Sequence, residues 1–205
     1  MSPALEQCLY LFSNALLIPT LIAIIALALW TALLAGGLVR EWLERDRVRA
    51  GLARLGSLLN SGDPDPAQWR EVRASCPAGL PARLLRRMPE PPTAVERDKC
   101  LEDLEWEVTA QLSRLTWMTR VAPMLGLMGT LIPLGPALTG LASGDMAKLS
   151  SNLVVAFTAT VAGVFLGCAA FTMSLIRKSW YGRDLSDLEH LFTRRDGVVP
   201  TPPQP

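Results

Sequence analysis

The sequence has 205 residues, of which 50% are hydrophobic, and its 20 basic side chains nearly balance its 19 acidic ones. This balance argues against the basic surface that a nucleic-acid partner requires. The hydrophobic residues are gathered into three charge-free blocks, Gln7–Val39, Val121–Gly144 and Leu149–Ile176. A bilayer core takes about 20 apolar helical residues to cross, and each block reaches that length without a soluble helix's polar stripe. We therefore predict an all-α membrane protein with three transmembrane helices and long helical extensions that form a bundle.

The first block predicts an N-terminal interfacial segment followed by transmembrane helix 1, together residues 1–39. A secretory signal peptide is the alternative, but Glu6 and the lack of a basic residue at the start do not fit one, and the apolar run is too long. Either a short interfacial helix over residues 3–12 precedes a span of about 17–39, or one long helix is kinked at Pro19. The sequence leaves both arrangements open.

Residues 40–116 predict a region of helices separated by turns. Apolar residues recur at helical spacing over 41–60, which indicates that the first helix continues beyond its span. Pro66 follows an aspartate and is typical of a first helical position. The proline-rich residues 76–92 have room for only a short helix.

A long helix is predicted to lead from residue 93 straight into transmembrane helix 2, at residues 117–141. Thr93 and Glu96 have the spacing of a capping box, which marks the helix start. An apolar stripe then follows at helical spacing: Val95, Leu101, Leu104, Val108, Leu112 and Leu115.

The rest of the chain predicts a hairpin of membrane helices and a C-terminal extension. An external link over 142–148 joins the second span to transmembrane helix 3 at 149–176. Residues 177–196 predict an amphipathic C-terminal helix, and the polar, proline-rich residues 197–205 a disordered tail. The apolar positions of that helix are Trp180, Leu185, Leu188 and Phe192.

The distribution of basic residues predicts the orientation, because Lys and Arg accumulate on the cytoplasmic side of membrane helices. Nothing basic precedes the first span, and the link over 142–148 is nearly neutral. The N-terminus is therefore expected outside, and residues 40–116 and the C-terminus in the cytoplasm of a multi-pass membrane protein. Basic residues flank the spans on the opposite side: Arg40, Arg45, Arg47, Arg49, Arg114, Arg120, Arg177, Lys178 and Arg183.

Motifs of soluble enzymes are lacking from the sequence. It has no phosphate-binding loop, no nucleophile elbow and no H-E-x-x-H. His190 is the only histidine, and a solvated or packed role is expected for it rather than a catalytic one. The arginines of 83–87 are expected on a solvated face rather than on lipid. Because the four cysteines are scattered without metal-site spacing (Cys8, Cys76, Cys100 and Cys168), we expect neither an enzyme nor a metal or other cofactor.

Small residues share one face of each of the last two predicted spans. Small side chains let membrane helices approach closely. One interpretation is plain helix packing, with each threonine bonding back to its own turn. In the other, the two faces meet around a narrow polar path, and the threonines supply oxygens to an ion or a partner. The faces comprise Ala122, Pro123, Gly126, Gly129, Thr130, Pro133 and Ala137 in the second span, and Ala156, Thr160, Gly163 and Gly167 in the third.

The three blocks also lack any acidic or basic side chain. A proton that crosses a membrane usually needs such a relay, and none of the blocks contains Asp, Glu, His, Lys or Arg. The chain is therefore expected to be either a passive scaffold or one half of a machine whose carboxylate comes from another protein.

Two motifs resemble the signature helices of the MotA/TolQ/ExbB proton-channel family. They are VAPMLGLMGTLIPLGPAL, similar to A-P-x-L-G-L-x-G-T, and VVAFTATVAGVFLGCAAF, similar to A-L-x-A-T-x-x-G with Phe157 in place of leucine. The three-span layout with its large cytoplasmic loop resembles the ExbB and TolQ branch, since MotA has four spans. The resemblance is close over residues 114–177 and covers the preceding loop only in helical character.

The resemblance implies a pentamer that encloses the helix of a smaller single-span partner similar to ExbD, TolR or MotB. In that family an aspartate on the partner helix and threonines of the channel subunit line the ion path. By position these threonines are Thr130 and Thr160. The pentamer and its partner are thought to turn relative to one another and so transmit force, which implies an energy-transducing subunit related to protein transport.

The sequence departs from the family at two places. ExbB-like members often carry a glutamate one residue before the alanine matched by Ala156, where this chain has Val155. Pro133 and Pro136 also alter the continuation of the second motif. The chain therefore resembles a divergent branch, whose task the sequence does not name. Two functions are expected as alternatives: an ion-driven energy transducer, and a structural membrane scaffold that conducts nothing.

Overall fold

The computed structural model describes residues 8, 11–12, 15–60, 66–75, 79–88 and 94–195, and within these ranges the chain is helical with no strand. It divides into two compact units. The span unit comprises the described residues of 1–35 and 114–174, and the bundle unit those of 36–113 and 175–205.

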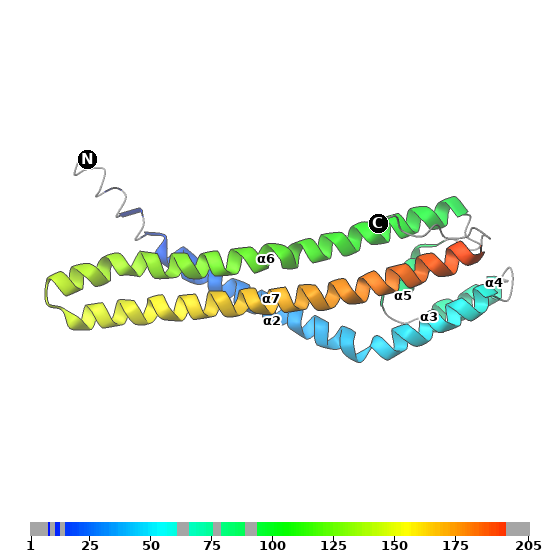
Figure 1. The fold of residues 1–205 in the computed structure, drawn as a ribbon, viewed down its shortest axis with the longest axis horizontal. Helices are drawn as coiled ribbons and strands as arrows, with labels where there is room; N and C mark the ends of the chain where they lie inside the picture. Colours follow the sequence, from blue (N-terminus) through cyan, green and yellow to red (C-terminus); the bar gives the residue numbers. More distant parts are fainter. Residues whose placement is uncertain are drawn as a thin grey trace, which may run out of the picture. The chain divides into compact units, whose positions relative to one another are not determined.

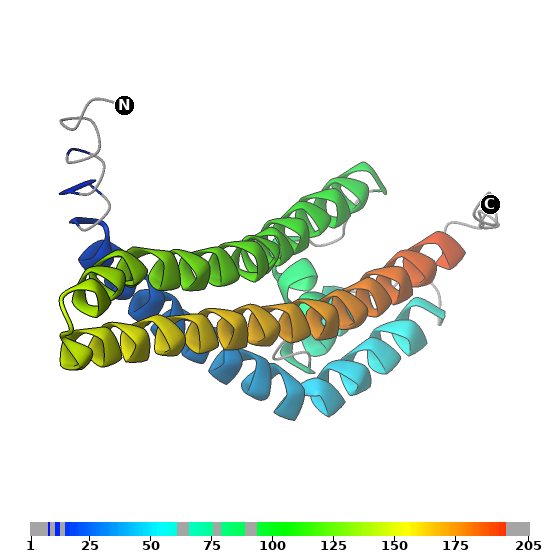
Figure 2. The same cartoon turned by 60° about the vertical axis from the view of Figure 1, so that its left-hand side comes forward.

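Three helices contribute to the span unit: α2 (Leu17–Leu43), α6 (Ala94–Ala142) and α7 (Met146–Arg195). Each is long and apolar enough to cross a membrane, as the sequence predicts. Pro19 lies in the first turn of α2, where proline is well tolerated. Within the unit α6 and α7 run side by side in opposite directions (Figure 1, Figure 2).

A tight turn joins α6 to α7. Gly144 has a φ of 75°, a left-handed conformation that glycine adopts without a Cβ clash. Its N–H donates to the Leu141 carbonyl at 3.1 Å, and the Asp145 N–H donates to the Gly140 carbonyl at 2.8 Å. These two bonds form a Schellman cap. The Asp145 carboxylate then accepts from the Lys148 N–H at 2.9 Å and caps α7, so this short turn determines how the hairpin closes.

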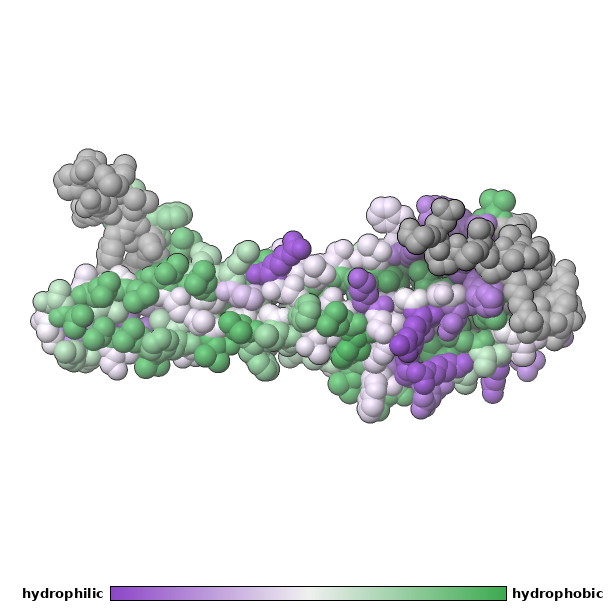
Figure 3. All heavy atoms as spheres, in the orientation of Figure 1, coloured by the Kyte–Doolittle hydropathy of each residue, from purple (hydrophilic) through white to green (hydrophobic). Residues whose placement is uncertain are grey.

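The span unit has a small core and a large apolar exterior. Its buried cluster consists mainly of small or slender side chains: Ile24, Leu27, Met118, Ala122, Ala159, Leu166 and Ala170. Larger apolar side chains lie outside, among them Leu33, Leu131, Phe157 and Phe165. Hydrophobic residues accordingly cover the visible face of these helices in Figure 3. Large apolar side chains on the outside suit helices that are surrounded by lipid or by other membrane helices. Lipid tails are themselves apolar, so these side chains need not be buried inside the protein to avoid water.

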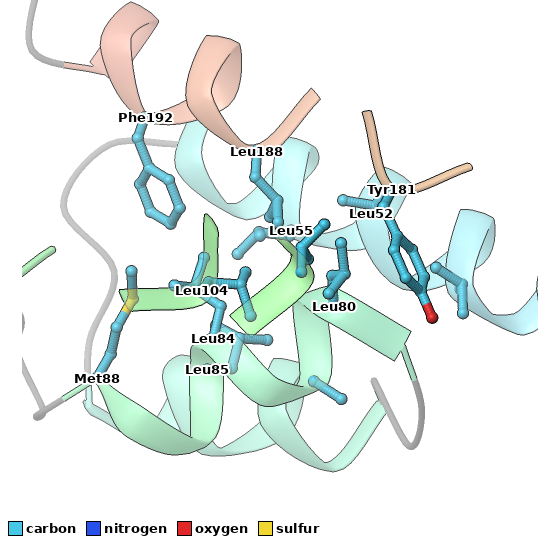
Figure 4. Packing of buried hydrophobic residues seen from close by; sticks show 13 residues of the cluster. Leu52, Leu55, Leu80, Leu84, Leu85, Met88, Leu104, Tyr181, Leu188 and Phe192 are labelled. Carbon is cyan, nitrogen blue, oxygen red and sulfur yellow. The ribbon is translucent and has the colours of Figure 1, made fainter. Parts of the chain in front are cut away.

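The bundle unit adds three shorter helices, α3 (Arg45–Asn60), α4 (Pro66–Ser75) and α5 (Gly79–Arg87). With the ends of α6 and α7 they enclose an apolar core, in which the labelled side chains point toward one another (Figure 4). Each buried leucine contributes roughly 1.5–3 kcal/mol relative to an exposed one. The fully buried members of the core are Leu55, Leu84, Leu85, Leu104, Leu188 and Phe192.

Two details differ from the sequence prediction. The first helix does not continue unbroken, because a turn at Glu44 separates α2 from α3 and leaves Leu43 68% exposed. Val95 is 80% exposed rather than part of the apolar stripe. At about 100° per residue it lies roughly half a turn around the helix from Leu104, which the core does bury.

Several predictions concern residues outside the described ranges. These are most of the N-terminal interfacial segment, the threonine of the capping box at residue 93, Cys76, and the C-terminal tail over 197–205.

Candidate functional site

The small residues of α6 and α7 meet in a close helix contact within the span unit. A side-chain carbon at Gly163 would lie 2.7 Å from the Ala122 carbonyl oxygen and 2.7 Å from Cα of Gly126. A carbon at Gly129 would lie 2.5 Å from Cβ of Ala159. No side chain fits between the helices at this level.

The prolines of the second motif lie inside a helix that remains continuous. Proline lacks an N–H, so Pro123 leaves the Thr119 carbonyl without its usual helical donor. Gly167 lies against this place: a side-chain carbon there would be 2.7 Å from the Pro123 ring and 3.5 Å from the Thr119 oxygen. Pro133 is fully buried. Covering proline-interrupted turns with protein is what makes them tolerable at membrane depth.

The two threonines lie beside this contact and are half-buried. The Thr130 hydroxyl donates to the Leu127 carbonyl at 2.7 Å, and the Thr160 hydroxyl donates to the Ala156 carbonyl at 3.2 Å. Each hydroxyl oxygen retains lone pairs that can accept a hydrogen bond or contact a cation. A role for Thr130 and Thr160 in an ion path therefore stays a prediction.

The small faces of α6 and α7 pack against each other within a single copy of the chain. Ala156, Gly163 and Gly167 are buried, and the nearest atoms to Gly163 and Gly167 belong to α6. Helix α7 follows α6 after a turn of three residues, which brings the two small faces together.

Sequence reasoning missed the contribution of α2. Its buried residues are Thr20, Ile24, Leu27 and Thr31, and Ile24 approaches within 3.7 Å of the place of a Gly129 side chain. Thr20 and Thr31 donate their hydroxyls to carbonyls one turn earlier, each at 2.7 Å. The alternating spacing of four, three and four residues is the signal that could have identified this face.

A network of charged side chains lies in the bundle unit, where α2 gives way to α3. Arg45 binds both carboxylate oxygens of Asp184, at 2.6 and 2.8 Å. Glu41 lies 3.3 Å from Arg177, and its two carboxylate oxygens, each 3.1 Å from the Tyr181 hydroxyl, share the single hydrogen bond that this hydroxyl donates. Arg177, Tyr181 and Asp184 are successive positions on one face of α7, so the network fastens that face to the end of α2 and the start of α3.

The position of Tyr181 in this network shifts the ionisation of its phenol. Burial, followed by the negative charge of Glu41, raises the pKa of Tyr181 from 10.0 to about 12. A raised pKa in the folded state means that the neutral phenol stabilises the fold below pH 10. That stabilisation is lost as the pH rises from 10 through 12.

The remaining groups that the sequence singles out are the cysteines, the arginines of 83–87 and His190. No group of three or more His, Cys, Asp or Glu side chains there has the arrangement of a metal site. Arg83 and Arg87 both pair with Glu107, at 2.8 and 2.7 Å, and their side chains remain 42% and 47% exposed. His190 is exposed.

Three long apolar helices, a hairpin closed by glycine contacts and a polar network at the end of α2 define a multi-pass helical membrane protein. The model of the MotA/TolQ/ExbB proton channel family matches residues 91–190, about half of the chain. The chain belongs to this family, and membership assigns it the general function of a proton-channel-type motor subunit. No curated protein and no solved structure matches the chain.

Proposed function

We propose that the chain is the channel subunit of a proton-driven inner-membrane motor. It converts ion-motive force into mechanical work through a single-span partner similar to ExbD, TolR or MotB. The observation that carries the proposal is the pair of hydroxyls, Thr130 and Thr160, beside a close hairpin contact whose charge-free blocks, 121–144 and 149–176, contain no Asp, Glu, His, Lys or Arg. Such a site offers oxygen ligands along a path but cannot itself accept a proton.

The partner must therefore supply the titratable group. Val155, at the position where ExbB-like relatives often carry glutamate, is 36% exposed, whereas its neighbour Ala156 is buried in the hairpin. Position 155 thus faces away from the α6–α7 contact, toward lipid or another chain. With valine there, an aspartate of the partner helix is the carboxylate of the proposed path.

We further propose a homo-oligomer, a pentamer by resemblance to the family, with partner helices at its centre. Because the glycine faces are occupied within each chain, subunit contacts and the pore wall use other faces of the helices. Large exposed apolar side chains are available there, including Leu127, Leu131, Val161 and Phe165. Native mass spectrometry of the detergent-purified protein tests the proposed oligomer. A stable monomer or dimer, both with and without the partner, would contradict the proposed motor function.

The direct test of the function is proton uptake by vesicles. We expect uptake when the chain is co-reconstituted with its single-span partner, and none with either protein alone. Replacing the aspartate of the partner helix by asparagine should also abolish uptake, because the amide cannot carry a proton. Uptake that persists without the partner would contradict the proposed division of labour.

A structural scaffold that holds a partner and conducts nothing is the second candidate. It is favoured by the hydrogen bonds of Thr130 and Thr160, which both donate to their own helix as threonines in plain helix packing do. A complex that assembles normally but shows no uptake under any partner variant would establish the scaffold instead.

Thr130→Val and Thr160→Val are each expected to abolish ion flux while leaving the complex assembled. Valine keeps the volume of threonine, and losing one neutral hydrogen bond costs only about 0.5–1.5 kcal/mol. Thr139→Val and Thr158→Val are matched controls, since both residues are exposed and also donate to their own helices. Normal flux in both test variants would leave packing as the only role of this pair.

The orientation is tested by cysteine labelling in a background without native cysteines. A maleimide that cannot cross the membrane should reach a cysteine at Ser143 from outside and should not reach one at Asp63. The reason is the accumulation of arginine around residues 40–120 and its absence from the link over 142–148. The reverse labelling pattern would invert the proposed topology.

A further inference from the structure

A groove lies in the bundle unit at the end of α2, directly after the charge-free segment that ends at Val39. Three large apolar side chains of this helix end are exposed: Val39, Trp42 and Leu43. Tryptophan at the end of an apolar span is typical of the membrane–water interface, where its ring lies at the level of the lipid headgroups. The groove is therefore placed where headgroups are found.

The groove has a volume of about 300 Å³, at the lower end of the range for small-molecule sites. It is lined by Trp42, Leu43, Arg45, Asp46, Arg49 and Trp180. Arg45 is held firmly, because it pairs with Asp184 and lies 5.4 Å from the centre of the Trp180 ring. Its Nε is buried and has no hydrogen-bond partner within the part of the chain that the structure describes.

Two opposite charges face this groove without pairing. Asp46 and Arg49 are three residues apart on α3, and both are exposed. Neither forms an ion pair with the other or with another residue in the described ranges. The bundle unit contains an i,i+3 pair, Lys99–Glu102 at 3.7 Å, and an i,i+4 pair, Arg40–Glu44 at 3.1 Å, so opposite charges one helical turn apart do pair elsewhere in it. Asp46 and Arg49 instead leave one anionic and one cationic group directed at the same hollow.

We propose that this groove binds the headgroup of a phospholipid that carries a primary ammonium, as phosphatidylethanolamine does. The phosphate binds Arg49, the ammonium binds Asp46 between the two tryptophan rings, and the acyl chains follow Val39 and Leu43. A purely anionic headgroup fits less well, because Asp46 repels it and Asp184 already neutralises Arg45. Tryptophan faces also attract ammonium groups. The assignment does not depend on ion conduction.

Native mass spectrometry of the full chain in detergent tests the proposal. Phosphatidylethanolamine, phosphatidylglycerol and phosphatidylcholine with identical acyl chains are offered together. We expect the ethanolamine lipid to be retained preferentially. Asp46→Asn should abolish that preference and increase retention of the glycerol lipid. Arg49→Gln should weaken binding of the ethanolamine lipid about fivefold, which corresponds to about 1 kcal/mol per basic residue at a headgroup.

Matched controls separate the groove from general surface charge. Arg54→Gln on α3 and Asp187→Asn on α7 make the same charge changes at exposed residues that do not line the groove. Both should bind lipid as the unchanged chain does. Because all four altered residues are exposed, thermal unfolding should be the same for every variant.

Three results would overturn the proposal. Equal retention of the three lipids would remove the role of the ammonium, and an unchanged preference in Asp46→Asn would place the lipid elsewhere. Displacement of the lipid by soluble phosphoethanolamine at equal concentration would show that the groove takes a free headgroup rather than a lipid.

Discussion

Gly163→Leu is expected to separate α6 from α7 and to unfold the hairpin of the span unit. The first side-chain carbon would lie 2.7 Å from backbone atoms of Ala122 and Gly126, and backbone cannot move aside as a flexible side chain can. Extra methylenes in a well-packed core cost about 1–3 kcal/mol. Leucine adds four carbons against backbone, so we expect the upper end of that range or more. Thermal unfolding in detergent and size-exclusion chromatography measure the loss.

Gly182→Leu is the matched control on the same helix. A side-chain carbon at Gly182 meets no atom within 4 Å. Replacing a helical glycine there should be neutral or stabilising by up to about 1 kcal/mol, because glycine is a poor helix former. Equal melting temperatures for Gly163→Leu and the unchanged chain would refute the close contact, even if Gly182→Leu behaves as expected.

The second large effect is expected from Asp184→Asn in the bundle unit. The side chain of Asp184 is 5% exposed and that of Arg45 is 14% exposed, so the substitution leaves a nearly buried guanidinium without its counter-charge. Breaking a buried ion pair in this way costs about 3–5 kcal/mol. Unfolding followed by tryptophan fluorescence is a suitable measurement, because Trp180 contacts the affected arginine.

The double variant Arg45→Met/Asp184→Leu should recover most of that stability, since it removes both buried charges together. Asp103→Asn provides the control for the same chemical change. It breaks a solvated i,i+4 pair with Lys99, for which we expect a much smaller loss of stability than for Asp184→Asn. A double variant no more stable than Asp184→Asn would mean that the pair stabilises through its specific geometry and not through charge compensation.

Much of the architecture follows from local pattern. The absence of charge over three long blocks indicates the helices that can span a membrane, because a continuous apolar segment in lipid satisfies its backbone hydrogen bonds within one helix. The apolar residues of 177–196 lie at helical spacing, and the core of the bundle unit buries Leu188 and Phe192 as that spacing predicts. The family motifs could likewise be identified from the order of residues, since they are short and contiguous.

The sequence by itself determined which residues are small and which helices are apolar. Only the tertiary structure decided which helix each small-residue face packs against. From the sequence, Gly126 and Gly163 could pack against a neighbouring subunit, line a pore or close the chain's own hairpin. The order of residues on one helical face does not specify which other helix that face contacts. The short turn at Gly144 settles this by bringing α7 onto α6. The Arg45–Asp184 ion pair could not be predicted from the sequence either, since 139 residues separate its two members. Two opposite charges among 39 ionised groups become partners only when folding removes them from water together.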